Sequence, residues 1–327
     1  MRRIHELYCT DGVLTQGRGI QVGEDAFAIP GYRKYGGNLR VNILAMGDVG
    51  GTLALAMKLT GADIISKIGI CDIKEAVLSR WEHELNQITM PNDPDAFPQV
   101  KVVNVNDVFD CDVFLFCASH GVPDLSQAGT DVRMAQLEQN REMIGVYGKQ
   151  AAACGFDGEF FVVSDPVDPL CKAVAENGID VARIQGFGLG VMNARAMYYA
   201  RQNKEFVDYL TKGRVFGPHG EDLVVADNIY DYHEDTSLKL TELTTSANVR
   251  IRELGFKPFI APAVSSGALS ILENLRGHWH YSSACFGNAF LGMLNKRNDN
   301  DLLVEDLPLD ERLFRRIEAA YRNLEEL

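Results

Sequence analysis

The sequence predicts an α/β protein built on a doubly wound parallel sheet, followed by a smaller α+β unit. Between residues 39 and 164, short apolar strands alternate with amphipathic helices, which is the pattern of successive β-α-β units. A glycine-containing turn directly follows the first of these strands and opens a helix, as a ligand-binding turn of such a sheet does. After about residue 186 the regular alternation is lost, which indicates a second kind of unit.

The elements of the first unit follow one another in the order that a parallel sheet requires. The segment LRVNILAM at 39–46 is the first strand, and further strands are expected at 64–71, 100–103, 113–116 and 160–164. Helices are expected between them at 50–59, 73–87 and 132–154. Right-handed crossovers through these helices make the sheet doubly wound.

The second half of the chain mixes helices and short strands. Helices are expected at 190–203, 236–254 and 264–275, and the charged amphipathic segment DERLFRRIEAAYRNLEEL ends the chain. Strands are expected at 214–216, 223–225, 279–284 and 290–294. We therefore predict an N-terminal arm over 1–38, a parallel-sheet domain over 39–185 and an α+β domain over 186–327.

Composition excludes several classes of protein. The chain has 32 Lys and Arg residues against 45 Asp and Glu, a net charge of −13, so no basic surface is expected for nucleic acid or for an anionic membrane. No apolar run approaches the length that spans a bilayer. The seven cysteines are scattered and odd in number, which favours free thiols and a cytoplasmic location.

The turn after the first strand reads AMGDVGG at 45–51. In a dinucleotide-binding turn of the Rossmann type, one glycine lets the backbone approach a pyrophosphate and another lets the helix pack closely on the strand. Gly47 and Gly50 stand in these places, and alanine replaces the first glycine of the pattern. Asp72 ends the second strand, where a carboxylate accepts hydrogen bonds from ribose hydroxyls and repels a 2′-phosphate. The predicted cofactor is NAD, in contact with Gly47, Asp48, Val49, Gly50 and Asp72.

Four further motifs follow in order: an arginine with an asparagine seven residues later, SDPVD at 164–168, a helix carrying an arginine, and GPHG at 217–220. In order and spacing they resemble the motifs of the lactate/malate dehydrogenase family. The resemblance implies that Arg133 and Asn140 act on the substrate carbonyl and that Arg195 grips the substrate carboxylate. It also implies that His219 is the catalytic proton donor. Ala118 and Asp165 join the predicted cofactor contacts near the nicotinamide.

These residue types suit the chemistry that the resemblance implies. Hydride transfer to a 2-oxo acid builds negative charge on an oxygen that must also receive a proton, and histidine can supply that proton near neutral pH. A guanidinium beside the carbonyl stabilises the developing charge. A second guanidinium can hold a carboxylate with two parallel hydrogen bonds.

The sequence departs from the family pattern at the partner of the histidine. The family carries Asp-x-x-Arg on a helix, but here the aspartate position falls on Met192 or on Asn193, according to the alignment. We take Asn193 as the residue that orients His219, and expect the pKa of His219 to lie at or below its ordinary value. It stays open whether another acid, such as Asp165, Asp168 or Glu221, reaches His219 through space. Two alternatives stay open: an NAD-binding homologue with little or no dehydrogenase activity, and an NAD- and metal-dependent glycosidase. No metal site is expected.

The loop before Arg133 indicates the substrate class. Lys and Arg are absent between Lys101 and Arg133. By the resemblance, Gln127, or Ser126 if the loop is aligned on Gly129, takes the position that reads the far end of the substrate. A neutral side chain there favours a 2-oxo monocarboxylic acid over a dicarboxylic acid, because a second carboxylate would lack a charged partner. The resemblance and the apolar segment HWHYSSACF imply a homodimer or homotetramer.

Overall fold

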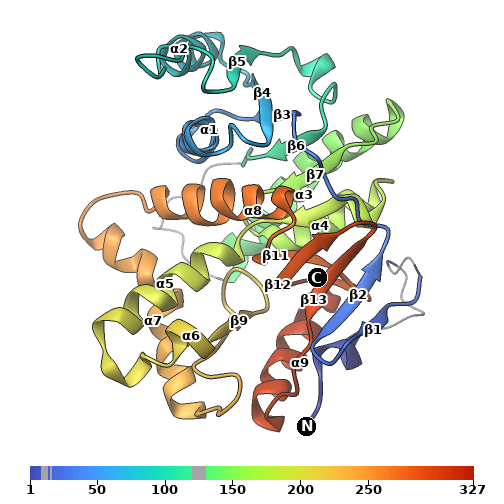
Figure 1. Cartoon of the computed structure of the whole chain (residues 1–327), viewed down its shortest axis with the longest axis vertical. Helices are drawn as coiled ribbons and strands as arrows, with labels where there is room; N and C mark the ends of the chain where they lie inside the picture. The colour runs from blue at the N-terminus through green and yellow to red at the C-terminus, as the bar shows by residue number, and fades with distance from the viewer. Residues whose placement is uncertain (9–13, 15–16, 120–129) are drawn as a thin grey trace.

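The computed structural model describes residues 1–8, 14, 17–119 and 130–327, and its largest feature is a mixed sheet of eleven strands (Figure 1). In order across the sheet these are β1 (Ile20–Val22), β2 (Ala26–Pro30), β13 (Asp301–Glu305), β12 (Ala289–Asn298), β11 (His280–Phe286), β8 (Ile184–Gly186), β7 (Glu159–Val162), β6 (Val113–Phe116), β3 (Leu39–Leu44), β4 (Ile65–Cys71) and β5 (Gln99–Val102).

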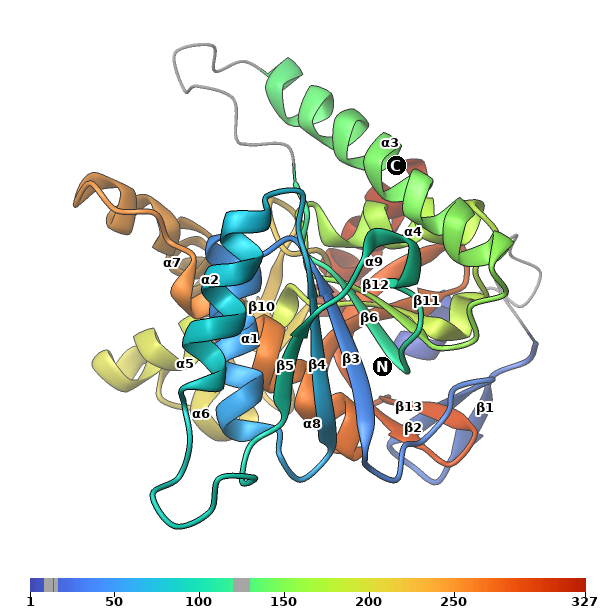
Figure 2. The ribbon, with the colours of Figure 1, turned by 90° about the horizontal axis from the view of Figure 1, so that it is seen from above.

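Strands β3 to β8 are all parallel and form the predicted doubly wound half. Figure 2 shows its helices on both faces. One face is covered by α1 (Asp48–Thr60) and α2 (Glu75–Asn86), and the other by α3 (Thr130–Ala153) and α4 (Val167–Glu176). The predicted α/β fold class is confirmed, and the helix expected at 132–154 is α3.

The two central parallel strands, β6 and β7, form because their sequences are almost wholly apolar. All four residues of β6, VFLF, are buried, and so are the four of β7. A strand with helices over both faces has no polar side to present, so it reads as a continuous apolar run. Such a sheet holds its carboxyl-end loops on a rigid platform.

The antiparallel half is joined to the parallel half within the same sheet. Strand β11 pairs with β8 through Ser283 and Gly186, and β12, β13, β2 and β1 follow in antiparallel order. The sequence analysis did not anticipate β13, β1 or β2. The arm therefore adds two strands to the sheet. The sheet also runs across the predicted domain border between residues 185 and 186, and that border stays a prediction.

The remaining elements are a small second sheet, six helices and several short turns among the described residues. A small sheet of β9 (Arg214–Phe216) and β10 (Val224–Ala226) carries the GPHG turn between its strands. The helices are α5 (Leu189–Gln202), α6 (Tyr209–Lys212), α7 (Glu234–Glu253), the π-helical η6 (Pro262–Leu269), α8 (Ser270–Arg276) and α9 (Glu311–Glu326), with short 3₁₀ turns at Ile4–Leu7, Val105–Asp107, Val181–Arg183 and Lys204–Phe206. None of the helices within the described ranges is long and apolar enough to cross a membrane.

A buried polar network ties the two halves and the arm together. The guanidinium of Arg297, on β12, is fully buried and forms an ion pair with Glu159 of β7. It also donates to Gln185 of β8 at 2.6 Å, to Asn274 of α8 at 2.8 Å and to the main-chain oxygen of Arg33 at 3.0 Å. A buried charge is stable only when it is paired and hydrogen-bonded, so this network fixes how the three parts fit together.

Candidate active site

The glycine turn presents an open helix N-terminus. Gly47 is the N-cap of α1, and a Cβ built there would meet nothing within 4 Å. A Cβ on Gly50 would lie 2.0 Å from the main-chain oxygen of Ala45, so only glycine allows the turn to close this tightly. Ala45 adopts a positive φ of 72°, which costs an alanine about 1 kcal/mol or more. The turn thus has the open cradle of main-chain N–H groups that a pyrophosphate requires.

Asp72 braces this turn from the end of β4. One carboxylate oxygen accepts a hydrogen bond from the main-chain N–H of Met46 at 2.7 Å, and the other accepts from that of Lys74 at 3.0 Å. Each oxygen keeps a further lone pair, so these contacts leave room for a ribose hydroxyl. Asp48 extends from the start of α1 and forms an ion pair with Lys257 at 3.2 Å; this partner offsets its negative charge beside the phosphate cradle.

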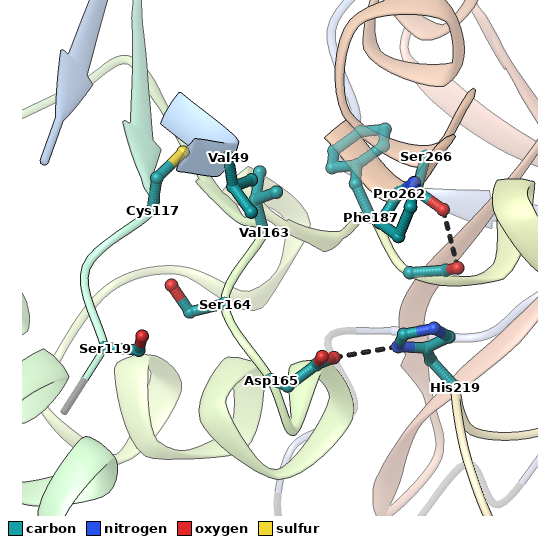
Figure 3. A pocket seen from close by; sticks show the side chains of 11 residues that line it. Val49, Cys117, Ser119, Val163, Ser164, Asp165, Phe187, His219, Pro262 and Ser266 are labelled. Carbon is teal, nitrogen blue, oxygen red and sulfur yellow. Dashed lines mark hydrogen bonds and ion pairs between the residues drawn. The ribbon is translucent and has the colours of Figure 1, made fainter. Parts of the chain in front are cut away.

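A cavity of about 160 Å³ lies between the carboxyl ends of the parallel strands and the second half of the chain (Figure 3). It combines residues that follow β6 and β7 with residues from the GPHG turn and from η6. Val49 of the glycine turn reaches it, so the cofactor turn and the predicted catalytic histidine share one space. The lining residues are Val49, Cys117, Ser119, Val163, Ser164, Asp165, Phe187, Gly188, His219, Pro262 and Ser266.

His219 and Asp165 face one another in this cavity (Figure 3). The imidazole Nδ1 lies 2.8 Å from a carboxylate oxygen of Asp165, while the buried Nε2 has no hydrogen-bond partner within the described residues. A Cβ on Gly188 would lie 2.7 Å from the Cβ of His219, so glycine at 188 permits the close approach of the turn. The arrangement leaves one ring nitrogen free for a ligand.

The pair has a clear electrostatic direction. Burial lowers the pKa of His219, but the charge and hydrogen bond of Asp165 outweigh it, and the net pKa is raised above 6.5. The charge of His219 and its hydrogen bond likewise lower the pKa of the Asp165 carboxyl group, whose side chain is 64% exposed. The expectation of a His219 pKa at or below its ordinary value is therefore wrong, because a carboxylate does reach the ring, from the end of β7 rather than from a helix.

A second carboxylate supports the same turn. Asp168, in the first turn of α4, accepts the main-chain N–H of His219 at 3.4 Å and the hydroxyl of Ser283. Its side chain is buried, and burial raises its pKa to about 6, although both hydrogen bonds act in the opposite direction. Asp165 and Asp168 thus hold the ring and the backbone of one histidine from a single corner of the chain.

Two predicted site residues on α5 have different surroundings. Asn193 accepts a hydrogen bond from the Tyr209 hydroxyl at 2.8 Å, so it is not the partner of His219, and that prediction is corrected. Arg195 is buried, and its guanidinium donates to Asn248 and contacts the sulfur of Met192 at 3.5 Å. Desolvation lowers its pKa, and the nearby charge of Asp165 acts in the opposite direction. Across the described ranges, no carboxylate forms an ion pair with Arg195.

Asn140 supports the site from behind. It is fully buried in α3, and its amide donates to the main-chain oxygen of Asp165 at 2.9 Å. This contact fixes the peptide that carries the histidine's partner, so Asn140 lies beneath the cavity wall and not in the lining predicted for a substrate contact. The substrate contact expected of Asn140 stays a prediction.

Comparison with known proteins identifies the cofactor half. Residues 39–186 match a family described as lactate/malate dehydrogenase, NAD binding domain. Over this segment, the chain carries the NAD-binding domain of the lactate/malate dehydrogenase family. The match confirms the predicted cofactor NAD, and the open cradle at Gly47 and the brace at Asp72 fit it.

Individual relatives agree with the family. L-lactate dehydrogenase 2 of Staphylococcus aureus is 28% identical over 185 residues, 56% of this chain and 54% of that protein. The chain thus spans about half the length of the curated relatives it matches. The minor L-lactate dehydrogenase of Enterococcus mundtii superposes with a TM-score of 0.71 at 20% identity, over 88% of this chain and 96% of that one. The malate dehydrogenase of Picrophilus torridus gives 0.70 at 18%, over 88% and 95%. These two likenesses show a shared fold.

Two other predicted site residues, Gln127 and Arg133, lie wholly or partly outside the part of the chain that the structure describes. Gln127 lies outside the described residues, and Arg133 lies in α3 but its side chain is outside the described part. Ala118 follows β6, between two residues that line the cavity. No group of three or more His, Cys, Asp or Glu residues in the described ranges is placed to hold a metal ion.

Sequence reasoning missed part of the cavity wall. Ser266 of η6 donates to the main-chain oxygen of Gly188 at 2.6 Å and accepts the N–H of Val191 at 2.7 Å, which joins η6 to the start of α5. Asp165, Asp168 and Glu221 were left open as acids that could reach His219, and the sequence did not choose between them. One signal for the partner of His219 was available in the sequence. Compared with the family pattern, an acid is missing on α5 and an additional acid is present in SDPVD.

Proposed function

We propose that the chain is an NAD-dependent oxidoreductase that interconverts a 2-oxo monocarboxylic acid and its 2-hydroxy acid. One observation carries this proposal: His219 lines the cavity that Val49 of the cofactor turn also reaches, its Nδ1 is held by Asp165, and its buried Nε2 has no hydrogen-bond partner among the residues that the structure describes. A ring fixed in this way can give a proton to an oxygen placed at Nε2 and take it back in the reverse direction.

The cofactor and the substrate would meet at this ring. The turn at Gly47 and Gly50 would hold the pyrophosphate, and Asp72 a ribose, so that bound NADH supplies a hydride to the carbonyl carbon. His219 gives its proton to the carbonyl oxygen, which becomes the hydroxyl of the product. The Asp165 carboxylate stabilises the positive charge on the ring before the proton leaves.

Arg195 supports an acid as the substrate. Its guanidinium is buried beside the site without a carboxylate partner among the described residues, and a buried cation favours an incoming anion. By the resemblance, Arg133 would polarise the carbonyl, and the neutral Gln127 would favour a monocarboxylic acid. We further propose that the protein acts in the cytoplasm as a homodimer or homotetramer.

The test is a panel of 2-oxo acids of differing chain length and charge, each mixed with NADH, with loss of NADH absorbance as the readout. NAD affinity is measured alongside by calorimetry. We expect turnover with at least one monocarboxylic acid, and His219→Asn should abolish it while NAD still binds. Tight NAD binding without turnover on any acid would instead support the homologue with little dehydrogenase activity.

A further inference from the structure

We propose that Asp165, and no residue of α5, is the positioning residue that orients His219 and stabilises its protonated ring. This inference rests on the proposed function for its kinetic consequence, but the pair itself can be tested without turnover. It moves the carboxylate from the α5 position, where the family pattern has it, to the corner between β7 and α4.

The geometry fixes both members of the pair. The ring Nδ1 of His219 and a carboxylate oxygen of Asp165 are 2.8 Å apart, within the range of a charge-assisted hydrogen bond. Asn140 holds the main chain of Asp165 at 2.9 Å, and Asp168 accepts the main-chain N–H of His219 at 3.4 Å. With both backbones anchored, the carboxylate favours the tautomer that carries its hydrogen on Nδ1 and leaves Nε2 as the free ring nitrogen.

The competing positions on α5 are occupied by other contacts. The side-chain oxygen of Asn193 accepts from Tyr209, and its amide nitrogen lies 3.6 Å from the sulfur of Met197. Met192 is buried, cannot carry charge, and contacts Arg195. Neither residue is turned to His219, so restoring an acid on α5 would not rebuild the pair.

Three charged groups act on the His219 ring, and they come from two elements. Asp165 and Asp168, from the corner at α4, favour the protonated ring, and Arg195, from α5, opposes it. The facing residues of η6, Pro262 and Ser266, carry no charge. Asp165 alone among the three makes contact with a ring nitrogen, so its charge should dominate the ring's proton affinity.

The chemical consequence concerns how much of His219 is protonated and able to donate. A carboxylate at Nδ1 both orients the ring and favours its cation, whereas an amide in the same place orients the ring without stabilising the cation. In the serine-protease triad the corresponding change from aspartate to asparagine costs about 10⁴ in rate. Asp165→Asn should therefore reduce turnover strongly near neutral pH, mainly through kcat, since substrate grip belongs to Arg195.

The test measures the ring itself. The Cε1–H signal of His219 is assigned by its absence in His219→Gln and titrated by NMR in the wild type, Asp165→Asn, Asp165→Glu, Asp168→Asn and Asn193→Ala. We expect the pKa to fall by about one pH unit or more in Asp165→Asn, to be largely restored in Asp165→Glu and to be unmoved in Asn193→Ala. Asp168→Asn is the matched control: it removes a nearby acid without a ring contact and should shift the pKa less.

The outcomes separate this inference from the proposed function. An unmoved pKa in Asp165→Asn, or a larger shift in Asp168→Asn or Asn193→Ala, overturns the assignment. If Asp165→Asn fails to fold, the wild-type titration decides, because a pKa at or below about 6.5 contradicts a paired ring. The expected shift without turnover on any 2-oxo acid leaves the pair established and rejects the dehydrogenase. With turnover, the pH limb of reduction should move with the NMR pKa.

Discussion

The buried Asp168 provides a quantitative test of how the site is held together. Its pKa is raised from 3.8 to about 6, so the folded protein keeps this proton up to about pH 6, whereas the unfolded chain releases it near 3.8. Between these values the folded chain binds more protons, and its stability therefore falls as pH rises. At about 1.4 kcal/mol per pH unit, the ionised Asp168 costs about 3 kcal/mol above pH 6.

Asp168→Asn removes this cost, because an amide stays neutral at every pH used. The side-chain oxygen can still accept the N–H of His219, and the hydroxyl of Ser283 can turn to accept from the amide nitrogen. The measured quantity is the free energy of unfolding of the variant minus that of the wild type. We expect this difference to increase by about 3 kcal/mol between about pH 4 and about pH 7.5.

Urea denaturation followed by tryptophan fluorescence measures this difference at several pH values. Asp157→Asn is the control, because the side chain of Asp157 is 81% exposed and its substitution should leave the pH dependence unchanged. A difference between wild type and Asp168→Asn that is the same at both ends of the pH range would refute the reasoning, since it would mean that burial does not hold this proton.

Four further variants test the cofactor turn and the substrate grip. Gly50→Ala should weaken NAD binding at least tenfold by calorimetry, because its Cβ would meet the oxygen of Ala45 at 2.0 Å; unchanged affinity would contradict the close packing. Ala45→Gly should stabilise the protein by up to about 1 kcal/mol in urea melts, by relieving the positive φ, and a loss of stability would count against that strain. Asp72→Asn should reduce the preference for NADH over NADPH, which we expect to be at least tenfold in wild type; equal wild-type affinities would reject the role of Asp72. Arg195→Gln should lower kcat/KM for the 2-oxo acid by a factor that corresponds to about 1.5–3 kcal/mol of binding free energy, chiefly through a higher KM. An unaltered KM would exclude Arg195 as the residue that holds the substrate carboxylate.

Most of the parallel half was predictable because its signals are local, although β8 and α4 were not predicted. A strand such as β6 is apolar throughout. The glycine turn is predicted by a pattern of only seven residues. Strand β13 was missed for the opposite reason: DLLVE alternates between partly exposed and buried residues, is flanked by charges, and pairs with β2, far away in the sequence. Tertiary pairing, which no short window of sequence contains, decides such a strand.

The candidate site shows the same division. The order of motifs was sufficient to select His219, but not to find its partner, because the contact with Asp165 joins positions 54 residues apart through the end of one strand and a turn. The face of α5 that Asn193 occupies is set by its bond to Tyr209. A helix position shows which residues share a face, but not which neighbour that face meets.

The buried guanidinium of Arg297 limits how this protein could be recombined with its relatives. It comes from β12, yet its partners Glu159 and Gln185 belong to the parallel half, and Arg33 belongs to the arm. A chimera that joined this parallel half to another catalytic half would leave Glu159 buried without its cation, at a cost of about 3–5 kcal/mol. The two halves are therefore not interchangeable modules, and any graft of the cofactor half must carry the matching arginine and its acceptors with it.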